Sequence, residues 1–227
     1  MINALACELI GSFFLVSVVI GSGIMGENLS NGNDGIALLA NTVATGSILF
    51  VIIKAFSRIS GAHFNPAVSL VFFFLKKLNR TELLFYILSQ LLGGLIGVIV
   101  THYIFNLEII QISSNIRGEE KMLASEIIAT FGLIMTILFL NESRPNDVAL
   151  AVALFISAGY WFTASTAFAN PAVTLARIFT DTFTGIHPSS VIYFISGQGV
   201  GSFLSFIFYK KTIGKPKKGI KIKPIKY

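Results

Sequence analysis

Six stretches of this 227-residue chain are long, apolar and free of charged side chains. A helix needs roughly 20 apolar residues to cross the hydrocarbon layer of a membrane, and most of these stretches reach or approach that length. The composition agrees, because 54% of the residues are hydrophobic, only 12% are charged and the mean hydropathy is +0.77. The sequence therefore predicts an all-α membrane protein with six spanning helices. The stretches are Leu9–Gly26, Gly35–Ile53, Leu83–Leu107, Ile127–Asn141, Val148–Ala176 and Thr182–Tyr209.

The positive charges indicate an orientation, because short cytoplasmic loops collect Lys and Arg. These charges fall on one side if both termini are cytoplasmic, which predicts a multi-pass protein of the inner or plasma membrane. Residues 210–227 form a basic tail, and we expect it to face anionic lipid rather than to bind nucleic acid. The charges outside the tail that support this orientation are Lys54, Arg58, Lys76, Lys77, Arg80 and Arg144.

The chain contains an internal repeat, marked by three landmarks that occur twice in the same order. Each half opens with a glutamate before an apolar run, continues to an Asn-Pro-Ala-Val box, and later has a glutamine close to glycines. Each half also holds three predicted spans, an odd number, so the second half must enter the bilayer from the opposite side. The sequence therefore predicts an inverted repeat. Its parts are a first half at residues 1–107, an external linker at residues 108–120, a second half at residues 121–209 and the basic tail.

The two Asn-Pro-Ala-Val boxes are predicted to begin short helices, each with its Asn as the N-cap and its Pro as the first helical residue. About ten residues separate each box from the next charged side chain, which is enough for roughly half a bilayer at 1.5 Å per residue. The boxes therefore predict re-entrant half-helices. Irregular backbone at that depth is tolerated only where it is buried in protein or lines a water-filled cavity, so the sequence implies a pore. The residues assigned to its midplane are Asn65, Pro66, Ala67, Asn170, Pro171 and Ala172.

Two glutamates, Glu8 and Glu126, stand directly before the charge-free stretches that begin at Leu9 and Ile127. Helices that begin before these glutamates place them inside spans, where a carboxylate is costly unless it has hydrogen-bond partners. They occupy equivalent positions in the repeat, so we expect them to brace the re-entrant loops rather than to relay protons. Gln90 and Gln198 are expected to add to this bracing. The spacings Gly93-xxx-Gly97 and Gly197-xxx-Gly201 predict close packing of helices.

Together these features resemble the aquaporins and aquaglyceroporins, which are also called major intrinsic proteins. The resemblance covers roughly residues 4–209, through the paired boxes, the two helix-opening glutamates and the stretch Ser60-Gly61-Ala62-His63-Phe64 before the first box. It implies a homotetramer with one pore per protomer, passive conduction of small neutral molecules, no enzymatic activity and no cofactor. Two half-helix starts at the midplane would favour acceptor oxygens of a passing solute and disfavour cations.

The resemblance also implies an outer constriction of four positions, and here the chain departs from the family. The position directly after the second Asn-Pro-Ala is typically Arg, whereas this chain has Val173. By their spacing from the boxes, the other three positions correspond to Thr45, Ala158 and Ala167, with Gly159 as the alternative to Ala158. These side chains predict a constriction that is unusually wide and weakly polar.

Arg177, His63 and Tyr160 lie close to the two boxes in the sequence. Arg177 lies one helical turn beyond Val173 and either compensates for the missing Arg or anchors the helix at the outer surface. His63 is expected to line the cytoplasmic vestibule. The sequence assigns no role to Tyr160, and its His, Cys and acidic residues show no metal-ligand spacing.

Val after the second box is similar to a subgroup of bacterial aquaglyceroporins associated with arsenic resistance. That similarity implies passage of arsenite as a neutral hydroxide, and of small methylated arsenicals, besides glycerol-like polyols and water. Two alternatives remain open at this point: a water-selective channel in which Arg177 replaces the missing Arg, and a non-conducting membrane adhesion or assembly protein.

Overall fold

The computed structural model describes residues 1–118 and 120–213, and within these residues all regular secondary structure is helical. Residues 214–227 of the predicted basic tail lie outside the described residues. The α-helices are α1 (Ile2–Leu29), α2 (Asp34–Ser60), α3 (Pro66–Phe74), α4 (Arg80–Ile104), α5 (Glu120–Ser143), α6 (Val148–Phe162), α7 (Pro171–Ala176) and α8 (Val191–Ile213). Short 3₁₀ helices occur at η1 (Pro145–Asp147), η2 (Arg177–Phe179) and η3 (Pro188–Ser190).

The predicted order of spanning helices and half-helices is confirmed, with a difference in one helix. The helices α1, α2, α4, α5 and the segment Pro188–Ile213 are long and apolar enough to cross a membrane. The remaining predicted span, α6, has only 15 residues, which corresponds to roughly 22 Å of helix. It is short because the chain becomes extended at Thr163 and turns back into the interior.

Asparagines begin several of these helices. Asn33 and Asn79 accept hydrogen bonds from the first turns of α2 and α4, and Glu82 completes a capping box with Asn79. Asn65 and Asn170 cap α3 and α7 in the same way, each with a Pro at the start of the helix. The two boxes therefore begin helices of nine and six residues, as expected for half-helices.

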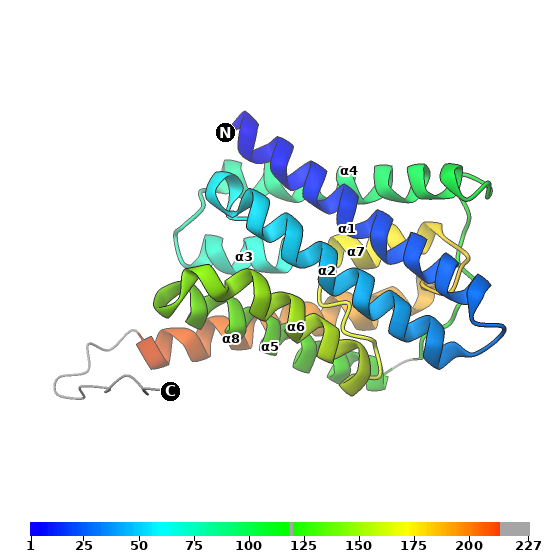
Figure 1. Ribbon diagram of the computed structural model, residues 1–227. Helices are drawn as coiled ribbons and strands as arrows, with labels where there is room; N and C mark the ends of the chain where they lie inside the picture. The colour runs from blue at the N-terminus through cyan, green and yellow to red at the C-terminus, as the bar shows by residue number, and fades with distance from the viewer. Residues whose placement is uncertain (119, 214–227) are drawn as a thin grey trace.

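The helices form two similar groups that face each other. In the first half α1 packs against α2 and α4, in the second half α5 packs against α6 and α8, and contacts between α2 and α6 join the halves. The half-helices α3 and α7 lie in the interior and approach each other from opposite ends of the molecule (Figure 1). Each also packs on the other half, because α3 contacts α8 and α7 contacts α4.

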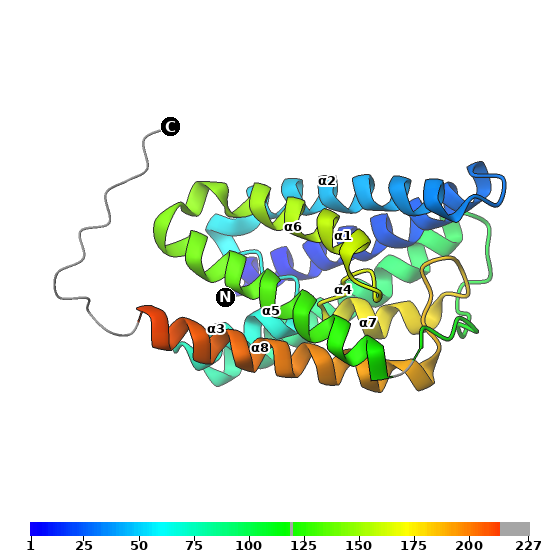
Figure 2. The ribbon, with the colours of Figure 1, turned by 90° about the horizontal axis from the view of Figure 1, so that it is seen from below.

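The two ends of the molecule differ. The N-terminus and the last turn of α8 lie at one end, which we call the terminal side (Figures 1 and 2). The connection between α4 and α5 lies at the opposite end, which we call the linker side, together with the loops between α7 and α8.

Glycines allow the long helices of each half to approach closely. A Cβ atom on Gly93 would collide with the carbonyl oxygen of Leu9, and one on Gly197 would lie 2.6 Å from the carbonyl oxygen of Leu123. These contacts join α4 to α1 and α8 to α5. The position of the repeat that corresponds to Gly93 is Gly201, where a Cβ atom would lie 2.7 Å from the carbonyl oxygen of Ile127. The predicted close packing at these glycine spacings therefore has a backbone-to-backbone cause.

Candidate functional site

The two loops that lead into the half-helices contain left-handed residues other than glycine. In the first loop Ala62 has φ 53° and Phe64 has φ 48°, and in the second Thr166, Ala167 and Ala169 have φ between 46° and 58°. The backbone of each of these residues has a strained conformation, which persists only when the surrounding structure stabilises it. The source of that support is therefore part of the site.

Glu8 supports the first loop from the interior of the bundle. Its buried carboxylate accepts hydrogen bonds from the backbone N–H groups of His63 at 2.9 Å and Phe64 at 2.7 Å. It also accepts from the Ser60 hydroxyl at 2.7 Å and from the Gln90 amide at 2.8 Å. One side chain thus supplies acceptors to a loop whose backbone forms no regular structure.

Glu126 makes the corresponding contacts in the second loop. Its carboxylate accepts from the backbone N–H groups of Phe168 at 3.0 Å and Ala169 at 2.8 Å. The Ser165 hydroxyl and the Gln198 amide donate to it at 2.5 Å and 2.7 Å. The two halves therefore hold their loops by the same set of groups.

The glutamines also reach the half-helices. Gln90 donates to the Ser69 hydroxyl in α3 at 3.0 Å, and Gln198 donates to the Thr174 hydroxyl in α7 at 2.9 Å. Each glutamine thus joins a long helix to both a loop glutamate and a half-helix.

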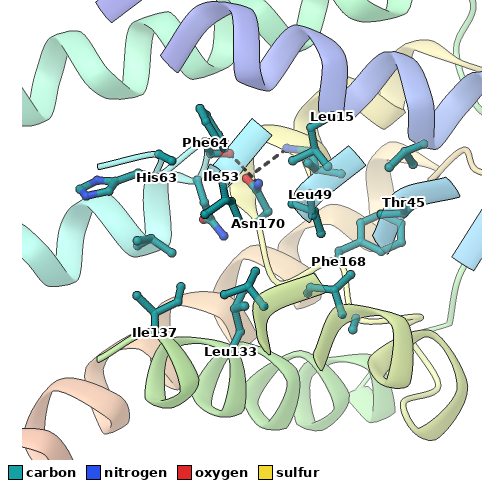
Figure 3. Close-up of a pocket in the computed structure, with 18 of the residues that line it drawn as sticks. Leu15, Thr45, Leu49, Ile53, His63, Phe64, Leu133, Ile137, Phe168 and Asn170 are labelled. Atoms are coloured by element: carbon teal, nitrogen blue, oxygen red, sulfur yellow. Dashed lines mark hydrogen bonds between the residues drawn. The ribbon is translucent and has the colours of Figure 1, made fainter. Parts of the chain in front are cut away.

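The side chains of Asn65 and Asn170 connect the two halves. Each Oδ1 accepts a hydrogen bond at 2.9 Å from the backbone of its own half-helix, Asn65 from Ala67 and Asn170 from Ala172. Each Nδ2 donates across the repeat, Asn65 to the carbonyl of Ala169 at 2.7 Å and Asn170 to the carbonyl of Phe64 at 2.8 Å (Figure 3). An amide nitrogen carries two N–H donors, so a second N–H remains on each Asn.

A narrow cavity runs through the centre of the bundle, with both asparagines in its wall (Figure 3). Its volume of about 90 Å³ is room for roughly three water molecules at the ~30 Å³ that each occupies in the liquid. His63 lies toward one end and Thr45 toward the other, with Asn170 between them. Most of the remaining wall is aliphatic, so the polar groups stand out as discrete positions along it.

A wider hollow lies beyond each end of the cavity. The hollow on the linker side has a volume of about 530 Å³, and the hollow on the terminal side about 690 Å³. The cavity and the terminal-side hollow share several lining residues, which makes them adjoining spaces. These residues are Ile53, Gly61, Phe72, Ile137 and Val148.

Arg177 lies where the cavity meets the linker-side hollow. Among the described residues, it is the one that lines both spaces. The side chain is only 3% exposed, its guanidinium lies 3.5 Å from the centre of the Phe168 ring, and its Nε donates to the carbonyl of Thr184. A stacked, hydrogen-bonded guanidinium has a fixed position, so this neck carries a positive charge.

The side chains predicted for the constriction are placed differently from one another. Thr45, Ala167 and Val173 line the cavity. Ala158 is exposed on the outside of α6, whereas Gly159 is buried and a Cβ added there would lie 2.6 Å from the Cβ of Ala167. The structure thus brings the alternative position, Gly159, toward the interior and leaves Ala158 outside.

Tyr160, to which the sequence assigns no role, also lines the cavity. Its hydroxyl donates a hydrogen bond to Thr45 Oγ1 at 3.1 Å. Val152, Ile156 and Tyr160 follow one another at intervals of four residues on α6 and form a stripe that faces the cavity. That stripe was the available signal in the sequence.

His63 lines the cavity near its terminal side. Its Nδ1 lies 3.0 Å from the Ser69 hydroxyl, and its ring packs 4.6 Å from the Phe72 ring and 5.4 Å from the Tyr86 ring, measured between centroids. Within residues 1–118 and 120–213, His, Cys, Asp and Glu form no group suited to hold a metal ion.

The linker between the halves folds against the loops of the second half. Arg117 donates to the carbonyls of Gly185 at 2.6 Å and Phe183 at 2.7 Å. Burial lowers the pKa of Arg117 to about 10, which still leaves it charged at neutral pH. Nearby, the backbone N–H and hydroxyl of Ser114 hold the pKa of the Asp181 carboxyl below its usual range.

Comparisons with known proteins agree with this architecture. The sequence profile described as major intrinsic protein matches residues 1–147. The aquaglyceroporin AqpS of Rhizobium meliloti (strain 1021) is 44% identical over 195 residues, which cover 86% of this chain and 83% of that protein. Aquaporin NIP2-3 of Zea mays is 30% identical over 210 residues, which cover 88% of this chain and 68% of that protein.

A solved structure is similar over nearly the whole chain. The X-ray structure of the aquaglyceroporin from Plasmodium falciparum matches with a TM-score of 0.73, covering 93% of this chain and 96% of that one. The sequence identity is 23%, so this likeness concerns the fold.

Proposed function

Because the chain belongs to the major intrinsic protein family, whose members are channels for water and small solutes, we propose that it passively conducts small neutral solutes together with water. The solutes we assign to it are glycerol-like polyols, arsenite and other metalloid hydroxides, and small methylated arsenicals. The protein is a multi-pass membrane channel and not an enzyme.

The observation that carries the proposal is the narrow cavity between two wider hollows, with Asn65 and Asn170 in its wall. A solute in an aliphatic passage needs hydrogen-bond donors at intervals to replace its lost water. The remaining N–H of each Asn amide is such a donor, and it favours the oxygen atoms of water, polyols and metalloid hydroxides. Donors at this position, together with the half-helix dipoles, disfavour cations.

The solute range rests on the residue after the second box. Val173 lines the cavity and offers neither charge nor hydrogen-bond donors. We assign the constriction to Thr45, Ala167 and Val173 together with Gly159 in place of Ala158. A neutral solute larger than water meets no guanidinium at position 173. The relation to an aquaglyceroporin of 44% identity supports polyols as one class of solute.

A water-selective channel is a second candidate, and the position of Arg177 favours it. This guanidinium lies at the neck between the cavity and the linker-side hollow. A fixed cation there narrows the passage and repels other cations.

We further propose that the linker side is external and both termini are cytoplasmic. The Lys and Arg residues of the short loops on the terminal side support this orientation. We also propose a homotetramer in the inner or plasma membrane, with one pore in each protomer.

Stopped-flow light scattering on proteoliposomes tests the function directly, with water, glycerol and arsenite permeabilities measured in one preparation. The proposal expects all three to exceed the values for protein-free liposomes. Water permeability alone would select the water-selective candidate, and no increase for any solute would favour the non-conducting assembly protein. Protein-free liposomes and a preparation with Asn170 replaced by Trp serve as the closed controls.

A further inference from the structure

A hydroxyl pair bridges the two halves of the chain at the wall of the cavity. Tyr160 in α6 donates to Thr45 in α2 at 3.1 Å, and these side chains are 5% and 2% exposed. Both residues also line the cavity. The pair is therefore buried within the protein while it faces the passage.

The residues of α2 that line the hollow and the cavity show how deep this pair lies in the passage. Leu38 and Asn41 line the linker-side hollow, whereas Thr45, Leu49 and Ile53 line the cavity. Because these residues follow the helical spacing of three to four, they form one stripe along the passage. Thr45 is thus the position of α2 at which the hollow gives way to the cavity.

The partner of Thr45, Tyr160, lies at the same depth on α6, which runs in the opposite direction to α2. On α6, Val148 lines both the terminal-side hollow and the cavity, and Val152, Ile156 and Tyr160 continue the stripe. Tyr160 is the last of these residues, at the end of the cavity nearest the linker side. The two stripes meet there, so the hydrogen bond joins the linker-side ends of both.

The chemistry of the pair suits a size and hydroxyl filter. Tyr160 uses its hydrogen on Thr45, so the Thr45 hydrogen and the remaining lone pairs are left for other partners. The ring is large and, while its hydroxyl is tethered, it is held at one wall of a cavity of only about 90 Å³. Loss of the tether frees the ring to change rotamer and widens this end of the passage.

We propose that Tyr160, held by Thr45, sets the upper size limit for solutes of this channel. The proposal rests on the proposed function and assigns its specificity to a residue outside the four constriction positions. It predicts that Tyr160 acts through its hydroxyl as well as its ring. Removal of either partner of the hydrogen bond then has the same effect on selectivity.

The conduction test compares Tyr160→Phe, Thr45→Val and the double variant in proteoliposomes, with erythritol, glycerol and water as probes. Both single variants are expected to raise the erythritol-to-water permeability ratio about fivefold, the factor that corresponds to roughly 1 kcal/mol for one hydrogen bond. The double variant is expected to match the single ones, because both remove the same interaction. Tyr103→Phe is the matched control, since Tyr103 is 76% exposed. An unchanged ratio in Tyr160→Phe overturns the proposal, and so does an effect of the double variant equal to the product of the two single effects.

A second readout does not depend on conduction. In a Cys7→Ala background, Leu49→Cys places a thiol in the cavity beyond the pair, and Leu38→Cys places one in the linker-side hollow before it. Hydroxyethyl methanethiosulfonate, a small neutral reagent, is added from the linker side. Tyr160→Ala is expected to speed modification at position 49 and to leave position 38 unchanged.

The two readouts separate the possible failures. A wild-type protein that conducts nothing contradicts the proposed function, while the thiol rates still decide whether Tyr160 limits access. Equal rates at position 49 with and without the Tyr160 ring overturn the size limit, whatever the channel conducts.

Discussion

Asn65 and Asn170 hold each other's loops: each donates its side-chain amide to the carbonyl of the residue directly before the other. The bonds measure 2.7 Å and 2.8 Å and run between residues more than a hundred positions apart in the chain. A single amide thus caps its own half-helix through oxygen and fixes the opposite loop through nitrogen. Only Asn or Gln carries both a donor and an acceptor of this kind, which explains why Asn occupies both boxes.

The substitution Asn65→Asp tests the cross-repeat bond. Asp keeps the cap on Ala67 but replaces the donor with an acceptor that faces the carbonyl of Ala169. We expect the free energy of unfolding to fall by about 1–3 kcal/mol, the usual cost of an unsatisfied buried group. Asn79→Asp is the control, because Asn79 caps an exposed helix end with the same geometry. Thermal unfolding in detergent measures the stability of both variants. Equal melting temperatures for Asn65→Asp and Asn79→Asp would contradict a stabilising role of the cross-repeat bond.

The substitution Val173→Arg tests the constriction. We expect glycerol and arsenite permeabilities to fall roughly tenfold, which corresponds to about 1.4 kcal/mol, with a much smaller change for water. Val173→Leu adds volume without charge and separates the two effects. Equal losses for water and glycerol in Val173→Arg would mean that position 173 does not set selectivity.

The substitution Arg177→Gln tests the charge at the neck. Gln removes the cation that stacks on Phe168 beside the linker-side hollow. We expect an increase in cation leak, measured as dissipation of a potassium gradient in proteoliposomes. Arg58→Gln changes an exposed Arg at the opposite hollow and serves as the control. A potassium leak that is the same in both variants would place cation exclusion elsewhere in the passage.

The substitution Glu126→Gln tests loop bracing. One carboxylate oxygen accepts from Phe168 and Ser165, and the other accepts from Ala169 and Gln198. An NH₂ group in place of either oxygen would face two donors, at a cost of about 1–3 kcal/mol for each unsatisfied buried donor. We expect a lower yield of folded protein before any change in selectivity. Glu120→Gln on the exposed start of the same helix should fold like wild type. Normal folding of Glu126→Gln with an altered pH dependence of conduction would point to proton chemistry instead.

The substitutions Gly93→Ala and Gly197→Ala test the close packing of the long helices. In both cases the added methyl would meet a backbone carbonyl, so relief requires the helices to separate. We expect each to lower the free energy of unfolding by about 1–3 kcal/mol. Gly199→Ala is the matched control on α8, because nothing lies within 4 Å of the position its Cβ would take. If Gly199→Ala lowers the free energy of unfolding as much as Gly197→Ala does, the effect arises within α8 and not from its contact with α5.

Much of the fold could be predicted because its signals are local or repeated. The Asn-Pro boxes carry their own helix starts, and the charge-free stretches give the spans without any knowledge of packing. The same landmarks appear twice, so the repeat and its inversion follow from counting spans. Glu8 and Glu126 stood out because a carboxylate within an apolar run requires partners.

The remaining features depend on the rotation and length of particular helices. The spacing from the second box predicts Ala158 at the constriction, whereas the rotation of α6 about its axis turns Gly159 and Tyr160 inward. The early end of α6 at Thr163 is decided by the loop that follows and not by its apolar composition. Arg117 reaches the loops of the second half only because the linker folds back over them, which its own sequence does not encode.

The bonds between the halves also constrain the order in which the protein can mature during synthesis. Glu8 and Gln90 belong to the first half, so that half has the means to shape its own loop as soon as it is inserted. The carbonyl that receives the Asn65 amide belongs to Ala169, which the ribosome adds much later. The two bonds between the halves can therefore form only after the second half has been synthesised, because each needs one group from either half.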